Sequence, residues 1–103
     1  MNSLAVVERD AAALRVEVTQ DEIIVTLVDG RVLSVPVTWY PRLSHGTKEE
    51  INTYELMGRG TGIHWPLLDE DISVSGLLRG NPSFESEQSL QHWLDERASR
   101  NKK

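Results

Sequence analysis

Apolar and polar residues alternate near the beginning of the chain, which is the pattern of a half-buried strand. Leu14, Val16 and Val18 are separated by the charged residues Arg15 and Glu17. The side chains of a strand point alternately to its two faces. This period of two therefore predicts a strand whose three apolar residues face a core.

Two further strand patterns follow. The segment Glu22–Val28 is rich in β-branched residues, and Arg31–Val37 has the same character. The dipeptide Asp29-Gly30 between them predicts a β-hairpin with a type I′ turn. Pro36 has no backbone N–H, so we expect it at the end of a strand or on a sheet edge. Residues 13–37 are thus predicted to form a three-stranded antiparallel meander.

Short helical segments are predicted next. Residues 38–43 resemble a helical turn that buries Trp39 and Leu43 against the sheet. Thr47 followed three residues later by Glu50 is a capping box, and it predicts a short helix over residues 48–54.

Gly58, Gly60 and Gly62 stand at alternate positions before an apolar stretch. This spacing is typical of a tight turn or bulge where two backbones approach closely. It does not match a phosphate-binding loop, because both the Gly-x-Gly-x-x-Gly and the Lys-Ser/Thr patterns are missing. We expect one or two strands within residues 55–65.

An acidic turn is expected over residues 67–71, followed by a helix over residues 73–79. Ser73 is placed to cap that helix, and Gly80 occupies the usual left-handed stop position after it.

A last helix is predicted over residues 86–100, with a narrow apolar stripe formed by Leu90, Trp93 and Leu94. Two interpretations of the stripe remain open. It can pack on this domain's own sheet, or it can anchor in the groove of a partner protein. The predicted fold class is α+β, with a domain over residues 1–82 and a C-terminal helix and frayed tail over residues 83–103.

Residues 58–80 read Gly-Arg-Gly-Thr-Gly-Ile-His-Trp-Pro-Leu-Leu-Asp-Glu-Asp-Ile-Ser-Val-Ser-Gly-Leu-Leu-Arg-Gly. This segment resembles the core motif of the bacterial domain-of-unknown-function family 2442. Trp-Tyr-Pro-Arg-Leu at residues 39–43 and Tyr-Glu-Leu at residues 54–56 fit the middle section of the family, and the resemblance extends over residues 5–80.

This resemblance implies a role in protein interaction. Members of the family are often encoded beside a second small protein, of unknown-function family 4160, and such pairs have been proposed as toxin–antitoxin modules with this family as the antitoxin. Some members carry an added helix-turn-helix domain. Too few residues follow Gly80 for such a domain, so we do not expect that DNA-binding half in this chain.

Composition narrows the classes of function. The net charge of −5 disfavours binding of nucleic acid by this chain alone, although Arg97, Arg100, Lys102 and Lys103 gather near its end. The same charge favours a basic protein partner, and a second copy of so short a chain would add stability. Without cysteine, thiol chemistry and disulfides are excluded. We expect a cytoplasmic protein, because neither a signal peptide nor a membrane-spanning run is present.

One cluster could carry chemistry: His64 and Trp65 followed by Asp69, Glu70 and Asp71. It could hold a metal or a small ligand, or provide acid–base groups. Alternatively it is structural, with the aspartates accepting backbone hydrogen bonds and His64 paired with one of them. The spacing is not that of a metal site, and the Gly-x-Ser-x-Gly pattern of a serine nucleophile is missing. We therefore expect neither an enzyme nor a cofactor.

Overall fold

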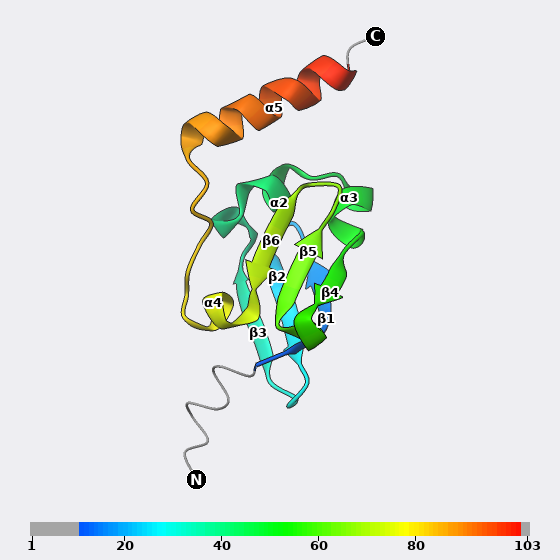
Figure 1. Ribbon diagram of the computed structural model, residues 1–103, viewed down its shortest axis with the longest axis vertical. Coiled ribbons are helices and arrows are strands. Elements are labelled where there is room, and N and C mark those ends of the chain that lie inside the picture. Colours follow the sequence, from blue (N-terminus) through cyan, green and yellow to red (C-terminus); the bar gives the residue numbers. More distant parts are fainter. Residues whose placement is uncertain (1–10, 102–103) are drawn as a thin grey trace.

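The computed structural model describes residues 11–101, whose strands form two three-stranded antiparallel sheets (Figure 1). Sheet A contains β1 (Ala13–Val18), β2 (Glu22–Leu27) and β3 (Val32–Pro36). Sheet B contains β4 (Glu55–Met57), β5 (Gly62–Trp65) and β6 (Glu70–Ser73). Both sheets follow the order of the sequence, so β2 and β5 are central and the other four strands are edges.

The meander predicted for residues 13–37 is confirmed as sheet A, with one correction to its inner face. The register shifts between Ala13 and Arg15, which marks a β-bulge in β1. The bulge gives the inward position to Ala13 and leaves Leu14 exposed, so the prediction that Leu14 faces the core was wrong. Val16 is buried as predicted.

The hairpin between β2 and β3 is confirmed, but its turn type was wrong. A type I′ turn needs positive φ at both central residues, and Asp29 does not have it. Gly30 has φ 99°, and its N–H donates to the carbonyl of Leu27 at 3.0 Å. This is a three-residue loop that ends in a left-handed glycine, and the side chain of Asp29 accepts from the N–H of Arg31 at 3.0 Å.

Three short helices connect the sheets: η1 (Val37–Trp39), α2 (Pro41–His45) and α3 (Lys48–Asn52). Leu43 is buried as expected, whereas Trp39 is half-buried and the neighbouring Tyr40 is the fully packed aromatic residue. The capping box is confirmed, because Thr47 accepts from the N–H of Glu50 and Glu50 accepts from that of Thr47. The helix ends at Asn52, two residues earlier than predicted.

Sheet B contains a strand that the sequence did not reveal. The two strands expected within residues 55–65 are β4 and β5, but Glu70–Ser73 is strand β6 and not part of an acidic turn. Ile72 is its single apolar residue, so its pairing with β5 is decided by tertiary contacts rather than by its own strand propensity. Ser73 caps α4 (Val74–Leu78) by accepting from the N–H of Gly76, and Gly80 adopts φ 79° as expected.

The glycine segment connects β4 to β5 and packs against β1 of sheet A. It forms η2 (Gly58–Gly60), in which Gly60 has φ 92°. A Cβ atom at Gly60 would lie 2.6 Å from the carbonyl oxygen of Ala13 in β1. The predicted close approach of two backbones is therefore confirmed, and only glycine fits there.

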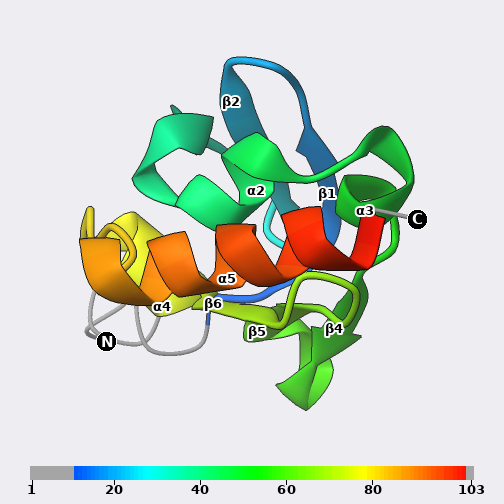
Figure 2. The same ribbon diagram turned by 90° about the horizontal axis from the view of Figure 1, so that it is seen from above.

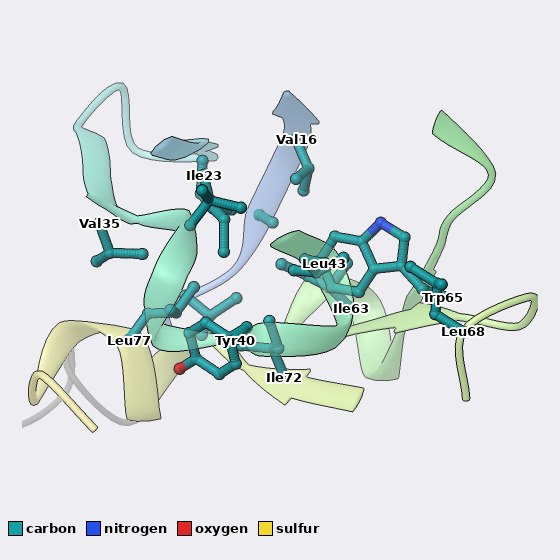
Figure 3. Packing of buried hydrophobic residues seen from close by; sticks show 14 of the residues in the cluster. Val16, Ile23, Val35, Tyr40, Leu43, Ile63, Trp65, Leu68, Ile72 and Leu77 are labelled. Carbon is teal, nitrogen blue, oxygen red and sulfur yellow. The ribbon is translucent and has the colours of Figure 1, made fainter. Parts of the chain in front are cut away.

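The core lies between the inner faces of the two sheets (Figure 3). Ile23, Val25 and Leu27 of β2 share it with Ile63 and Trp65 of β5, and all five are almost fully buried. The indole N–H of Trp65 donates to the carbonyl of Ile51 at 3.0 Å, so its polar atom is satisfied.

Helix α5 (Glu87–Asn101) crosses the end of the two sheets beside α2 and α3 (Figures 1 and 2). It begins after Ser86, whose hydroxyl accepts from the N–H of Ser89 at 3.0 Å. None of the helices in residues 11–101 is both long enough and apolar enough to cross a membrane.

Candidate functional site

The predicted cluster around His64 is divided between the two faces of sheet B. His64 pairs with Asp71 across the β5–β6 ladder, and Trp65 pairs with Glu70. Adjacent residues of a strand face opposite sides, so His64 and Asp71 lie on the outer face while Trp65 and Glu70 face inward. Asp69 lies in the turn between the strands, with φ 52°.

The outer pair is a close contact in which His64 Nδ1 lies 2.5 Å from Asp71 Oδ1. This is the pairing that the structural interpretation expected. Within the described chain, no group of three histidine or acidic residues could hold a metal ion. The structure thus brings two members of the cluster together and separates them from Glu70.

Glu70 has an unusual environment. Burial raises the pKa of this carboxyl from its ordinary value of 4.5 to about 7, and the negative charge of Glu85 adds to the effect. The nearby guanidinium of Arg42 opposes both by favouring the charged form. Glu70 also contributes to raising the pKa of Tyr40, although burial is the larger cause there.

We expect Glu70 to make the fold less stable as the pH rises from 5 to 8. The folded chain retains this proton up to about pH 7. The unfolded chain releases it near 4.5, so the stability that neutral Glu70 contributes is full below pH 4.5 and is lost as pH rises through about 7. Urea unfolding of the wild type and of Glu70→Gln at pH 5 and pH 8 measures the effect.

The Glu70→Gln variant should lose less stability than the wild type over that interval. Glu49→Gln, which alters an exposed carboxyl of α3, is the matched control and should keep the wild-type pH dependence. Identical pH dependence in Glu70→Gln and the wild type would contradict the assignment.

The stripe on α5 is turned toward the chain's own body. Trp93 is only 8% exposed and belongs to the hydrophobic core, with Leu90 and Leu94 packed against it. Two guanidinium groups lie over its ring: Arg42 of α2 at 5.0 Å from the ring centroid and Arg97 of α5 at 4.5 Å. Such cation–π contacts favour the docked position of the helix.

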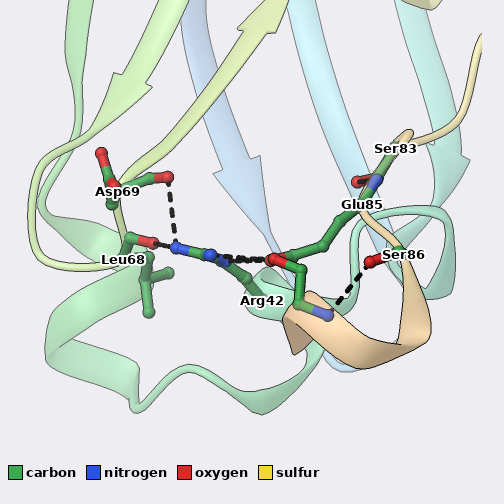
Figure 4. A network of polar contacts seen from close by, with 7 residues as sticks. Arg42, Leu68, Asp69, Ser83, Glu85 and Ser86 are labelled. Atoms are coloured by element: carbon green, nitrogen blue, oxygen red, sulfur yellow. Dashed lines mark hydrogen bonds and ion pairs between the residues drawn. The ribbon is translucent and has the colours of Figure 1, made fainter. Parts of the chain in front are cut away.

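Each of these two arginines is also held by a glutamate. Arg42 contacts Glu85 through Nε and Nη2, the latter at 2.7 Å, and it donates to the carbonyl of Leu68 at 3.0 Å (Figure 4). Arg97 contacts Glu50 with two bonds of 2.8 and 2.9 Å. The hydrogen bonds from Arg97 lower the pKa of Glu50 to about 2, so this pair stays ionised at neutral pH.

These contacts have consequences for both predicted roles of the C-terminal segment. A partner could bury itself against Trp93 only by displacing α5 from the body. Of the basic residues considered for DNA, Arg97 is engaged by Glu50, and Lys102 and Lys103 lie outside the described residues.

We expect Trp93→Ala to release α5 while both sheets stay folded. Truncating a buried tryptophan costs about 3 kcal/mol or more, and Trp93 is the buried apolar anchor of α5. In ¹⁵N-labelled protein, amides of α5 should lose protection from hydrogen exchange while those of β2 and β5 keep it. The control His92→Ala alters an exposed side chain of the same helix. It should leave the protection of α5 and that of the two strands unchanged. Loss of protection throughout the chain would show instead that α5 is integral to the fold.

The edge of sheet A at β3 carries backbone groups that point away from the sheet. Leu27 donates to the carbonyl of Arg31, and Val37 donates to that of Asp21. Bonded and non-bonded pairs alternate along an antiparallel ladder, so Leu33 and Val35 are the β3 residues that bond to β2. The N–H and C=O groups of Val32 and Ser34 therefore point away from the sheet.

This alternation also explains Pro36, which pairs with Glu22 at a non-bonded position where its missing N–H costs nothing. At the opposite edge of sheet A, formed by β1, an outward group has a bonding partner. The outward N–H of Val16 in β1 donates to the hydroxyl of Tyr54 at 3.1 Å. Across residues 11–101, the outward groups of Val32 and Ser34 have no such backbone or side-chain partner.

Exposed apolar side chains gather at the hairpin end of the same sheet. Leu14, Val28 and Val32 are 56%, 64% and 62% exposed. The register places all three around the pairs formed by Leu27 with Ala13 and by Thr26 with Val32. We call Val28, Val32 and Ser34 with the outward backbone of β3 the β3 edge. The sequence signals for it were the apolar residues flanking Asp29-Gly30 and the proline that marks an edge strand.

A hollow of about 550 Å³ lies between the β1–β2 turn and α2–α3. Its charged residue is Lys48, and the rest of its lining comes from Val18, Thr19, Gln20, Val37, Leu43, Ser44, Gly46 and Ile51. It is separate from both the His64–Asp71 pair and the β3 edge.

Comparison with known proteins agrees with the resemblance found in the sequence. Residues 13–83 match the family described as "Protein of unknown function (DUF2442)". A protein of unknown function from Rhodospirillum rubrum is 26% identical, with a TM-score of 0.60 over 76% of this chain and 94% of that one. An uncharacterised protein from Chromobacterium violaceum shares the fold at 21% identity, with a TM-score of 0.64 over 86% and 83% of the two chains. No curated protein matches the sequence.

Proposed function

This chain belongs to the DUF2442 family, and we propose that it is a protein-interaction module that binds its partner at the β3 edge. The observation that carries the proposal is the difference between the two edges of sheet A. The outward N–H of Val16 in β1 is bonded to Tyr54, whereas the outward N–H groups of Val32 and Ser34 in β3 lie beside the exposed side chains of Val28 and Val32. An open edge of this kind binds extended segments through main-chain hydrogen bonds.

The partner we propose is a basic protein, the product of an adjacent gene. The chain carries a net charge of −5, and two of its arginines, Arg42 and Arg97, are already engaged by glutamates. A basic partner would associate faster because of its opposite charge, and acidic proteins would be repelled. In such a pair, this chain would be the antitoxin-like or adaptor member.

Co-expression with the product of the adjacent gene tests the proposal. The two proteins should co-purify and associate at micromolar concentration. Ser34→Pro should weaken the association at least tenfold, because the proline removes an outward donor without removing a bond of the β2–β3 ladder. Ser34→Ala keeps the N–H and should bind like the wild type.

Thermal unfolding of each variant verifies that sheet A is intact. If the two proteins do not associate at micromolar concentration, the proposal fails. If Ser34→Pro is folded and binds as tightly as the wild type, the β3 edge is not the surface involved.

A further inference from the structure

We propose that the β3 edge is specific for an extended segment that carries apolar residues at one end and lysine or arginine at the other. The segment would add to sheet A as a fourth strand. This inference deepens the proposed function, and it rests on that function because it names the chemistry of the segment that the same edge would bind.

The backbone of β3 sets the geometry of the segment. Val32 and Ser34 each present one N–H donor and one C=O acceptor on the outer side of the ladder, which gives room for four main-chain hydrogen bonds. Their side chains lie on the outer face of sheet A, in the row shared with Thr26 and Ile24. The facing residues of an added strand must therefore be separated by an even number of positions.

The hairpin end of the edge selects apolar residues. Val28 and Val32 are both more than half exposed there. The single cation of the hairpin, Arg31, is already paired with Asp29 at 2.9 Å. An apolar side chain of the added strand would cover the two valines without desolvating an unpaired charge.

The opposite end of the edge selects a cation. A hollow of about 320 Å³ lies there, lined by Asp21, Glu22, Ser34, Val35 and Pro36. Glu22 contacts the hydroxyl of Ser34, and within residues 11–100 no basic side chain forms an ion pair with Asp21 or Glu22. The two ends are about 13 Å apart, the length of four strand residues. The apolar and basic residues are thus expected about four positions apart.

Charge also argues for a foreign segment over a second copy of this chain. Two copies joined through β3 would bring a total charge of twice −5 together. The cation nearest to the edge in each copy, Arg31, is engaged by its own Asp29. A basic segment relieves this repulsion, whereas a second copy increases it.

Two synthetic peptides with blocked termini test the inference: Thr-Val-Thr-Val-Thr-Lys-Thr-Lys and the same peptide with Glu in place of Lys. Each is titrated into the ¹⁵N-labelled full chain while amide resonances are followed. The Lys peptide should shift the amides of Val32 and Ser34 and should bind at least tenfold more tightly than the Glu peptide. Added salt should reduce that difference.

The double variant Asp21→Asn/Glu22→Gln should abolish the preference for the Lys peptide. Asp95→Asn/Glu96→Gln on exposed positions of α5 is the control with the same change in net charge, and it should keep the preference. Equal binding of both peptides, or shifts that leave Val32 and Ser34 unchanged, would overturn the inference.

The two proposals can fail separately. Partner binding that is lost in Ser34→Pro but unaffected by Asp21→Asn/Glu22→Gln would retain the interaction module and reject the basic segment. Concentration-dependent shifts of Val32 and Ser34 without any peptide, together with the hydrodynamic size of a dimer, would assign the edge to a second copy and overturn the inference.

Discussion

An open antiparallel sheet has two edges of unpaired backbone groups, and the arrangement of this chain depends on how those edges are satisfied. In sheet A the outward N–H of Val16 is bonded to Tyr54, which comes from the segment just before sheet B. Gly60 brings the same region against the backbone of Ala13. The middle of the β1 edge is therefore covered by residues that lie directly before and within sheet B. The β3 side keeps the outward groups of Val32 and Ser34, and this difference distinguishes the two edges of sheet A.

Helix α5 closes a different part of the molecule. Its position depends on Trp93, which is covered by two guanidinium groups, and on the glutamates that hold those groups. Glu50 has two structural roles: it completes the capping box of α3, and it binds Arg97 of α5. The match to the family ends at residue 83, before this helix begins. The helix nevertheless contacts Arg42 and Glu50, which lie inside the matched region.

The parts of the fold that were predicted correctly depend on local chemistry. The Thr47–Glu50 capping box, the Ser73 cap and the Asp29-Gly30 hairpin each act within a few residues, so the sequence alone reveals them. The errors arose where contacts between segments distant in the sequence determine the local structure. The bulge that exposes Leu14 and the pairing that makes residues 70–73 a strand both depend on neighbouring strands. The cluster around His64 was divided for the same reason, because the β5–β6 register puts His64 and Glu70 on opposite faces.

Hydrogen exchange of the β3 amides measures the central property directly. In the chain without a partner, Val32 and Ser34 should exchange rapidly while Leu33 and Val35, bonded to β2, exchange slowly. In the complex with the adjacent gene's product, Val32 and Ser34 should become protected as well. Strong protection of Val32 and Ser34 in the chain alone, or rapid exchange that persists in the complex, would contradict an open edge that binds a partner.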